Sequence, residues 1–320
     1  MTRTPPSSGT LTTLEAALAA LLDGVSSVAP RFVPLEQAMG RIAAAMPPAA
    51  SALPSHDIAV IDGWACLALD LMGASAYSPL ALPATPVWVE AGDAVPQGAD
   101  CLLHADLVDH STSIAMAVGE AVPGKGVRRR GEDMAQGSPP VLEGETVRAD
   151  DLLVARKAGL NQLAVRSPRV RVIDIAAANH ETFATHLVRE SVTASNGEIT
   201  AVNTCARDAA SIAAALDGDA CDLLLLVGGT GDGCADATAE ALARRGALVA
   251  HRLALRPGTT TAIGRFGGIP VIALPGAPDH AFAGFLALVR PILDRLSGCS
   301  ARPAASLPLS QKISSTVGLC

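Results

Sequence analysis

The chain has 320 residues, 49% of them hydrophobic, which allows two or three globular domains with sizeable cores. A net charge of -7 excludes a general attraction to nucleic acid or anionic lipid, and an aromatic share of 2% leaves too few rings to stack several bases. Seven scattered cysteines without a CxxC pair suit a reducing cytosol. With no signal peptide and no apolar run of membrane length, we expect a cytoplasmic protein with neither nucleic-acid nor membrane partners.

The first half of the chain predicts helices followed by a small β-rich domain. Thr12 and Glu15 fit a capping box, and the leucines after them form one helical face that ends near Gly24. A second short helix is predicted over residues 35–41. Between residues 58 and 147, short apolar runs are broken by Gly, Pro and Asp, a pattern typical of short strands joined by long loops.

The second half alternates strands with helices. After a helix over 150–160, the predicted strands are 170–177, 221–227, 251–255 and 270–275, and the predicted helices are 209–216, 235–246 and 281–293. This alternation favours a parallel sheet with helices on both faces. We therefore expect a helical linker region (11–50 with 148–168), a small β-rich domain (51–147), an α/β domain (169–298) and a short tail (299–320).

A glycine-rich turn follows the most apolar predicted strand. The run CDLLLLV is continuously hydrophobic, as expected for a strand covered on both faces, and it continues into Gly228, Gly229, Thr230 and Gly231. Such a turn brings backbone N–H groups and a helix N-terminus close to an anion. The alternative is a tight strand-to-helix turn without a ligand, because glycine-rich loops have many other uses.

Two further glycine loops follow predicted strands of the same sheet. RPGTT supplies Arg256 and Gly258, and LPGAPDH supplies Pro275 and Gly276. Loops after parallel strands meet at the carboxyl edge of a sheet, where ligands of such folds bind. A single Pro-Gly pair is ordinarily only a turn, so the case for a ligand site depends on all three loops occurring together.

Four aspartates stand in loop-like stretches: Asp62, Asp133, Asp208 and Asp236. Each alone is most often a helix cap or a solvated turn residue. If they converge, their oxygens suit Mg²⁺, which takes few protein carboxylates and keeps waters and phosphates. The basic run 128–130 could meet an anionic ligand, although such runs are usually solvated.

These motifs, in their order along the chain, resemble the molybdopterin molybdenumtransferase family, which includes the gephyrin E domain. The resemblance spans about residues 14–298 and consists of FVPLEQAMGR, LPSHDIAVIDGWA, AGDAVPQGADCLL, RRRGEDMAQG, GGTGDGCAD, ALRPG and LPGAPDHAFAGFLALVRPIL. It implies a three-layer α/β/α molybdopterin-binding domain built on a parallel sheet, a small β-rich domain and an elongated helical linker. The implied activity is insertion of molybdate into adenylylated molybdopterin with release of AMP, in a step that depends on Mg²⁺.

The resemblance also implies roles for individual residues. The four aspartates would be the catalytic residues, and Asp208, Asp236 and Glu181 would bind the metal. The pterin phosphate would bind the three glycine loops, through Gly228, Gly229, Thr230, Gly231, Arg256, Gly258, Pro275 and Gly276. A homodimer is implied, in which Asp62 could act across the interface, and a molybdopterin adenylyltransferase or a molybdoenzyme is a possible partner.

Several positions depart from the family pattern. This sequence has IDGWA where the family has MDGYA, AAANHETF where it has the TGDEL segment, and PGAP where it has PGNP. Ala91 replaces a threonine of the family, Gly231 replaces a serine, and Arg256 and Thr259 replace two lysines. About twenty residues stand where the family usually carries a C-terminal β domain. These changes leave open a catalytically impaired molybdopterin-binding carrier or regulator, and a structural scaffold with empty loops.

Overall fold

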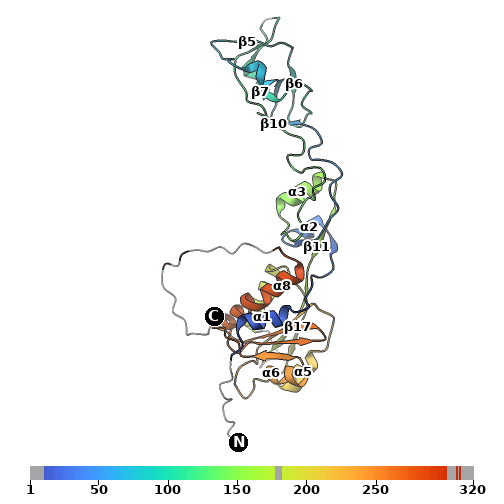
Figure 1. The fold of residues 1–320 in the computed structure, drawn as a ribbon, viewed down its shortest axis with the longest axis vertical. Coiled ribbons are helices and arrows are strands. Elements are labelled where there is room, and N and C mark those ends of the chain that lie inside the picture. The colour runs from blue at the N-terminus through green and yellow to red at the C-terminus, as the bar shows by residue number, and fades with distance from the viewer. Residues whose placement is uncertain (1–10, 112, 177–181, 301–307, 309, 311–320) are drawn as a thin grey trace. The chain divides into compact units, whose positions relative to one another are not determined.

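The computed structural model describes residues 11–111, 113–176, 182–300, 308 and 310 (Figure 1). The chain divides into two compact units. Unit 1 comprises residues 1–45, 142–147 and 162–320, and unit 2 comprises residues 46–141 and 148–161. The four segments predicted from the sequence stay a prediction. In the part of the chain that the structure describes, no helix combines the length and the apolar character that crossing a membrane requires.

Unit 1 contains a six-stranded sheet in the order β13-β12-β14-β17-β16-β15. Its strands are β12 (Arg169–Ile175), β13 (Glu198–Cys205), β14 (Leu223–Val227), β15 (Leu248–His251), β16 (Ala262–Phe266) and β17 (Ile269–Leu274). The pairings among β13, β12, β14 and β17 are parallel. The predicted parallel sheet is confirmed for these four strands. β16 is antiparallel to both of its neighbours, because a Gly267-Gly268 turn folds it directly back onto β17.

Helices cover both faces of this sheet (Figure 1). One face carries α1 (Leu14–Leu22), α4 (Phe183–Ala194), α7 (Pro278–Gly284), a π-helical segment (Phe285–Val289) and α8 (Arg290–Ser297); the other carries α5 (Ala209–Ala215) and α6 (Thr238–Arg244). Alternate residues of β14 enter the two cores, which is why the strand is continuously apolar. The three-layer α/β/α domain predicted from the sequence is confirmed.

Two local predictions were wrong. The N-cap of α1 is Thr13, whose side chain accepts from Ala16 N, and Thr12 instead pairs with Leu253 in a β-bridge. The predicted strand 251–255 is displaced, because β15 ends at His251, before the positive φ of the next residue. The sequence patterns also missed α4, β13 and β16 altogether.

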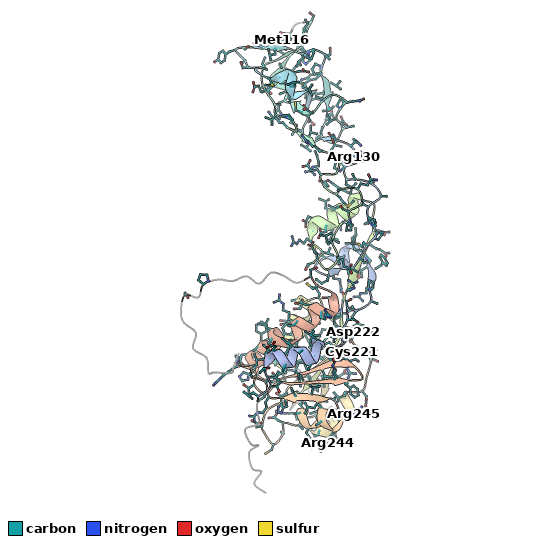
Figure 2. All side chains as sticks on the ribbon, in the orientation of Figure 1. Met116, Arg130, Cys221, Asp222, Arg244 and Arg245 are labelled. Carbon is teal, nitrogen blue, oxygen red and sulfur yellow. The ribbon has the colours of Figure 1, made fainter. Side chains whose placement is uncertain are left out.

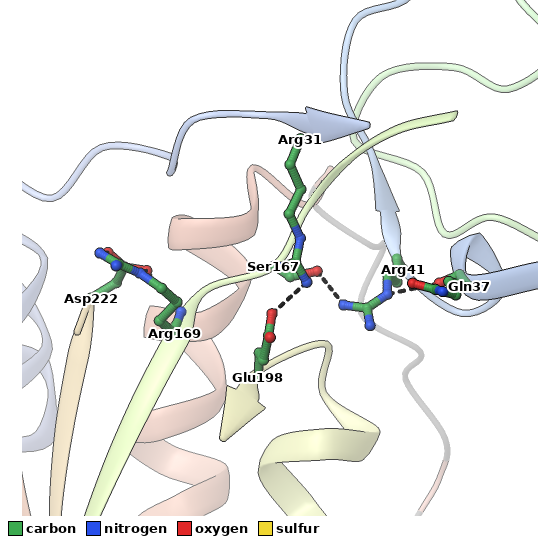
Figure 3. A network of polar contacts seen from close by, with 7 residues as sticks. All are labelled: Arg31, Gln37, Arg41, Ser167, Arg169, Glu198 and Asp222. Atoms are coloured by element: carbon green, nitrogen blue, oxygen red, sulfur yellow. Dashed lines mark hydrogen bonds and ion pairs between the residues drawn. The ribbon is translucent and has the colours of Figure 1, made fainter. Parts of the chain in front are cut away.

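A second, three-stranded sheet of unit 1 has the order β1-β11-β2. It consists of β1 (Arg31–Pro34), β2 (Ile42–Ala43) and β11 (Gln162–Arg166), with α2 (Leu35–Ala38) between the first two. An ion pair between Arg31 on β1 and Glu198 on β13 connects it to the large sheet (Figure 3). Arg41 Nη1 donates to Ser167 Oγ at 2.5 Å, in the link between β11 and β12. Arg41 Nε also donates to Gln37 O at 2.8 Å, which anchors the loop after α2.

Unit 2 is rich in short strands. Its elements are β3 (Ile58–Ala59), β4 (Gly63–Cys66), β5 (Leu80–Ala81), β6 (Val87–Val89), β7 (Cys101–Leu103), β8 (Val108–Asp109), β9 (Met116–Ala117), β10 (Val127–Arg128) and α3 (Ala149–Lys157), with 3₁₀ turns at Ala68–Leu71 and Ala105–Leu107. The sheets are β6-β4-β7, β5-β9-β8 and the pair β10-β3. Trp64 and Trp88, the two tryptophans of the protein, pack edge to face with centroids 5.1 Å apart.

Candidate functional site

The three glycine loops lie together at the carboxyl edge of the six-stranded sheet. β14 and β17 are parallel neighbours, so loops 228–237 and 275–277 leave the sheet at the same edge. Loop 252–261 joins them there, because β16 begins opposite the end of β17, at the pair Ala262 and Ala273. Gly228 N donates to Leu274 O at 2.9 Å and fixes the first loop against the end of β17.

The first two glycines after β14 are required by close backbone packing. Gly228 has φ +105°, and a Cβ there would lie 2.7 Å from Ile175 O at the end of β12. Gly229 has φ +62°, and a Cβ there would lie 2.7 Å from Thr238 Oγ1. That hydroxyl, at the start of α6, donates to Gly228 O at 2.9 Å. Only glycine combines these dihedral angles with so little space.

The N–H groups that follow are available to a ligand. Among the hydrogen bonds of the described chain, none uses the N–H of Gly229, Thr230 or Gly231 as its donor. Successive backbone N–H groups in a loop with positive φ form the kind of concave donor surface that binds phosphates and other anions. This loop is therefore suited to an oxyanion.

His251, the last residue of β15, and loop 252–261 together hold Thr230 in place. His251 Nε2 lies 2.9 Å from Thr230 O, and because a carbonyl only accepts, the ring nitrogen is the donor. The hydroxyls of Thr230 and Thr260 lie 3.3 Å apart. Thr230 itself is 2% exposed, so its side chain helps to join the two loops.

The remaining residues of the predicted binding set flank this junction. Gly258 is buried, and a Cβ on it would lie 3.2 Å from His280 O, beyond the third loop. Pro275 is buried and Gly276 exposed. Arg256 is exposed, so its guanidinium is available to an anion at this edge.

Asp236 is held tightly within the glycine loop. Its Oδ1 pairs with Arg207 Nη2 at 2.5 Å, and its Oδ2 accepts from Gly233 N at 3.0 Å. The carboxylate is 15% exposed. A second ion pair joins the same loop to its neighbour, since Arg252 Nη2 lies 3.0 Å from Asp232 Oδ2. Sequence reasoning missed both arginines, which carry no motif of their own.

Asp208 begins α5 as its N-cap. Its Oδ1 accepts from the N–H groups of Ala210 and Ser211 at 3.1 and 2.8 Å. The hydrogen bonds with Ser211 hold the pKa of this carboxyl below its ordinary value of 3.8. The residue before it, Arg207, contacts Asp236, so the segments that carry these two aspartates are neighbours.

Asp174 is a further carboxylate of this edge that the sequence reasoning missed. It lies near the end of β12, is fully buried, and accepts from both the N–H and the hydroxyl of Thr182, at 2.8 and 3.2 Å. Thr182 in turn caps α4. An acidic residue within the apolar run VRVIDIAA was the signal available in the sequence.

Asp62 and Asp133 belong to unit 2. Asp62 Oδ1 accepts from Ala91 N at 2.8 Å. Asp133 lies between two cations, with Arg128 Nη1 at 3.1 Å and Lys157 Nζ at 2.7 Å. Both carboxylates thus organise loops of their own unit.

The described carboxylates do not form a ready magnesium site. Over residues 11–111, 113–176 and 182–300, no group of three or more His, Cys, Asp and Glu side chains is arranged to hold a metal. Asp208 and Asp236 already accept protein N–H donors, and the cation next to Asp236 is Arg207. Glu181, the third predicted ligand, lies outside the described residues.

Comparisons with known proteins bear on both units. Residues 12–159 match the MoeA N-terminal region (domain I and II), and residues 176–295 match a family described as a probable molybdopterin binding domain. Molybdopterin molybdenumtransferase 2 of Mycobacterium tuberculosis is 28% identical over 90% of this chain and 81% of its own. A molybdopterin molybdenumtransferase of Synechococcus elongatus is 27% identical over 90% of this chain and 80% of its own.

A solved structure shares the fold as well. The molybdopterin biosynthesis MoeA protein of Pyrococcus horikoshii superposes with a TM-score of 0.68 and 27% identity, over 90% of this chain and 81% of that one. The matched regions follow one another as the motifs do in the sequence. Together these findings show that the chain belongs to the molybdopterin molybdenumtransferase family.

Proposed function

We propose that the protein is a molybdopterin molybdenumtransferase, which inserts molybdate into adenylylated molybdopterin and releases AMP during molybdenum cofactor biosynthesis. The observation that carries this proposal is a row of backbone N–H groups at Gly229, Thr230 and Gly231 that donate no hydrogen bond within the described chain, next to an exposed Arg256. Both features lie at the carboxyl edge of the domain that matches the molybdopterin-binding family. The relatives named above carry the same activity in their names.

The binding roles follow from what each loop offers. The N–H groups of loop 228–237 hold a phosphate of the adenylylated pterin. Arg256 receives molybdate or a second phosphate, since a guanidinium binds oxyanions through paired donors. Gly258, Pro275 and Gly276 keep the two neighbouring loops close to the first and leave the edge open to a flat ligand.

The catalytic roles remain those predicted from the family. Asp62, Asp133, Asp208 and Asp236 would act on the adenylate, with Mg²⁺ bound by Asp208, Asp236 and Glu181. Mg²⁺ would supply a Lewis acid for the phosphoryl group. Asp236 would bind the metal through lone pairs that its bonds to Arg207 and Gly233 leave over, since an ionised carboxylate has about four acceptor sites.

Further expectations complete the proposal. The protein works in the cytoplasm as a homodimer, and a molybdopterin adenylyltransferase or a molybdoenzyme is its partner. Size-exclusion chromatography with light scattering measures the dimer directly, and a monomeric mass at working concentrations would contradict it.

The deciding experiment is AMP release. Purified full-length protein is incubated with adenylylated molybdopterin, molybdate and Mg²⁺, and AMP is quantified by chromatography. We expect release well above the protein-free control and dependent on molybdate. Molybdopterin that stays bound to protein without AMP release would instead identify a catalytically impaired carrier and would refute the enzymatic proposal.

A further inference from the structure

A second concave site lies at the amino edge of the six-stranded sheet, opposite the glycine loops. A cavity of about 360 Å³ is bordered there by the starts of β12, β14 and β17, the end of β16 and the loop after α5. Small-molecule sites span about 300–1,000 Å³, so its size suits a compact ligand. Its apolar lining consists of Leu216, Leu224, Phe266 and Ile269.

One charged side chain enters this lining from the central sheet. Arg171 on β12 is 4% exposed. Both hydrogen bonds of its guanidinium come from Nη2, to Ala215 O at 3.0 Å and Leu216 O at 2.6 Å, the carbonyls that end α5. Its Nε is buried without a partner, and the described chain provides no carboxylate in ion-pair contact with it.

The charges around Arg171 leave room for one negative group. Asp217 also lines the cavity, but its two hydrogen bonds, at 2.9 and 2.7 Å, come from Arg245; these bonds lower its pKa most, and the charge of Arg171 contributes to the lowering. Asp219 is exposed at the rim, where water screens it. Cys221, labelled in Figure 2, also lines the cavity. Burial raises the pKa of its thiol, so the thiol is neutral. A buried cation lacking an anionic partner is costly, and a bound anion relieves that cost.

We propose that this amino-edge cavity binds a small monocarboxylate with a flat apolar body. The carboxylate pairs with Arg171 Nη1, which lies beside the lining residue Gly218 and donates no hydrogen bond within the described chain. The body packs against Leu224, Phe266 and Ile269. Phe266 is held in place by Arg245, whose guanidinium carbon lies 4.9 Å from the ring centroid. A ligand in this site leaves the carboxyl edge open, so the cavity is a separate site from the proposed pterin site.

The probe is 4-fluorobenzoate, titrated into the full-length protein and followed by ¹⁹F NMR. We expect a saturable shift, with affinity about tenfold higher than that of 4-fluorobenzyl alcohol, which has the same ring without the charge. Arg171→Gln should remove this preference. Equal binding of the two probes, or no saturable binding of the benzoate, would refute the proposal.

A second pair of variants serves if Arg171→Gln fails to fold. Ala220 is exposed and lines the cavity, whereas Ala214 is exposed on α5 away from it. Ala220→Trp should weaken benzoate binding about tenfold or more by filling the cavity mouth, while Ala214→Trp leaves it unchanged. Unchanged affinity in the Ala220→Trp variant would place the benzoate elsewhere and overturn the assignment.

Discussion

The tight packing of Gly229 can be measured against a matched glycine elsewhere in the same unit. Gly229 and Gly246 share nearly the same backbone angle, φ +62° and +64°. A Cβ on Gly246 meets nothing within 4 Å, whereas a Cβ on Gly229 lies 2.7 Å from Thr238 Oγ1. Alanine at the two positions therefore suffers the same backbone strain and differs only in the collision.

The expected difference follows from these contacts. A left-handed conformation destabilises an alanine by about 1–2 kcal/mol, and this strain lowers the unfolding free energy of both variants alike. In Gly229→Ala the hydroxyl of Thr238 must also move and lose its buried hydrogen bond to Gly228 O, now 2.9 Å long. An unmade buried hydrogen bond costs about 1–3 kcal/mol. Gly229→Ala should therefore lose about 1–3 kcal/mol more unfolding free energy than Gly246→Ala.

Urea unfolding followed by far-UV circular dichroism measures this difference. The two tryptophans, Trp64 and Trp88, both lie in unit 2, so their fluorescence monitors that unit separately. We expect the extra loss in the circular dichroism signal, with AMP release reduced in Gly229→Ala and retained in Gly246→Ala. Equal losses of unfolding free energy in the two variants would refute the packing argument.

Three further predictions concern single side chains. The depressed pKa of Asp208 means that its contribution to stability is present above about pH 4 and is lost as pH falls through that pKa. Asp208→Ala should therefore lower the urea midpoint at pH 7 and make the decline of the midpoint below about pH 4 less steep. Parallel pH profiles of the variant and the unmodified protein would contradict this. Leu226→Ala, at a fully buried position of β14, should cost about 2–5 kcal/mol in urea unfolding, and a loss below 1 kcal/mol would count against the core described here. Burial raises the pKa of Cys66 to about 11 and of Cys101 to about 12, so iodoacetamide at pH 8 should modify the exposed Cys234 first, and early modification of either buried thiol by peptide mass mapping would contradict their burial.

The sequence was most informative where local pattern and burial agree. The run from Leu223 to Val227 is apolar throughout because its side chains enter two different cores, so it was recognisable as a strand covered on both faces. β13 could not be recognised in this way, because it is an edge strand whose residues are only partly buried. β16 was missed because its identity depends on the turn that pairs it with β17.

In the candidate site, too, the features set by local pattern could be predicted and those set by tertiary contacts could not. The glycine loops could be placed at one edge because their positions follow from strand direction alone. The ion pair between Arg207 and Asp236 could not, since it joins residues 29 positions apart through the tertiary fold. The role of Asp208 as a helix cap, by contrast, was among the local alternatives that its position before an alanine-rich helix already suggested.

The small sheet of unit 1 has a consequence for how the whole chain is assembled. β2 and β11 are antiparallel neighbours, although residues 44–161 separate them in the chain, and Ala44 N donates to Ala164 O at 2.9 Å. Unit 2 is thus inserted into the chain between β2 and β11, where a hairpin would have a short turn. Replacing residues 46–161 with a short turn would keep this strand pair in register and remove, from unit 1, only segment 142–147. The six-stranded sheet begins only at Arg169, so unit 2 and the α/β domain are encoded by consecutive stretches of sequence that do not interrupt one another.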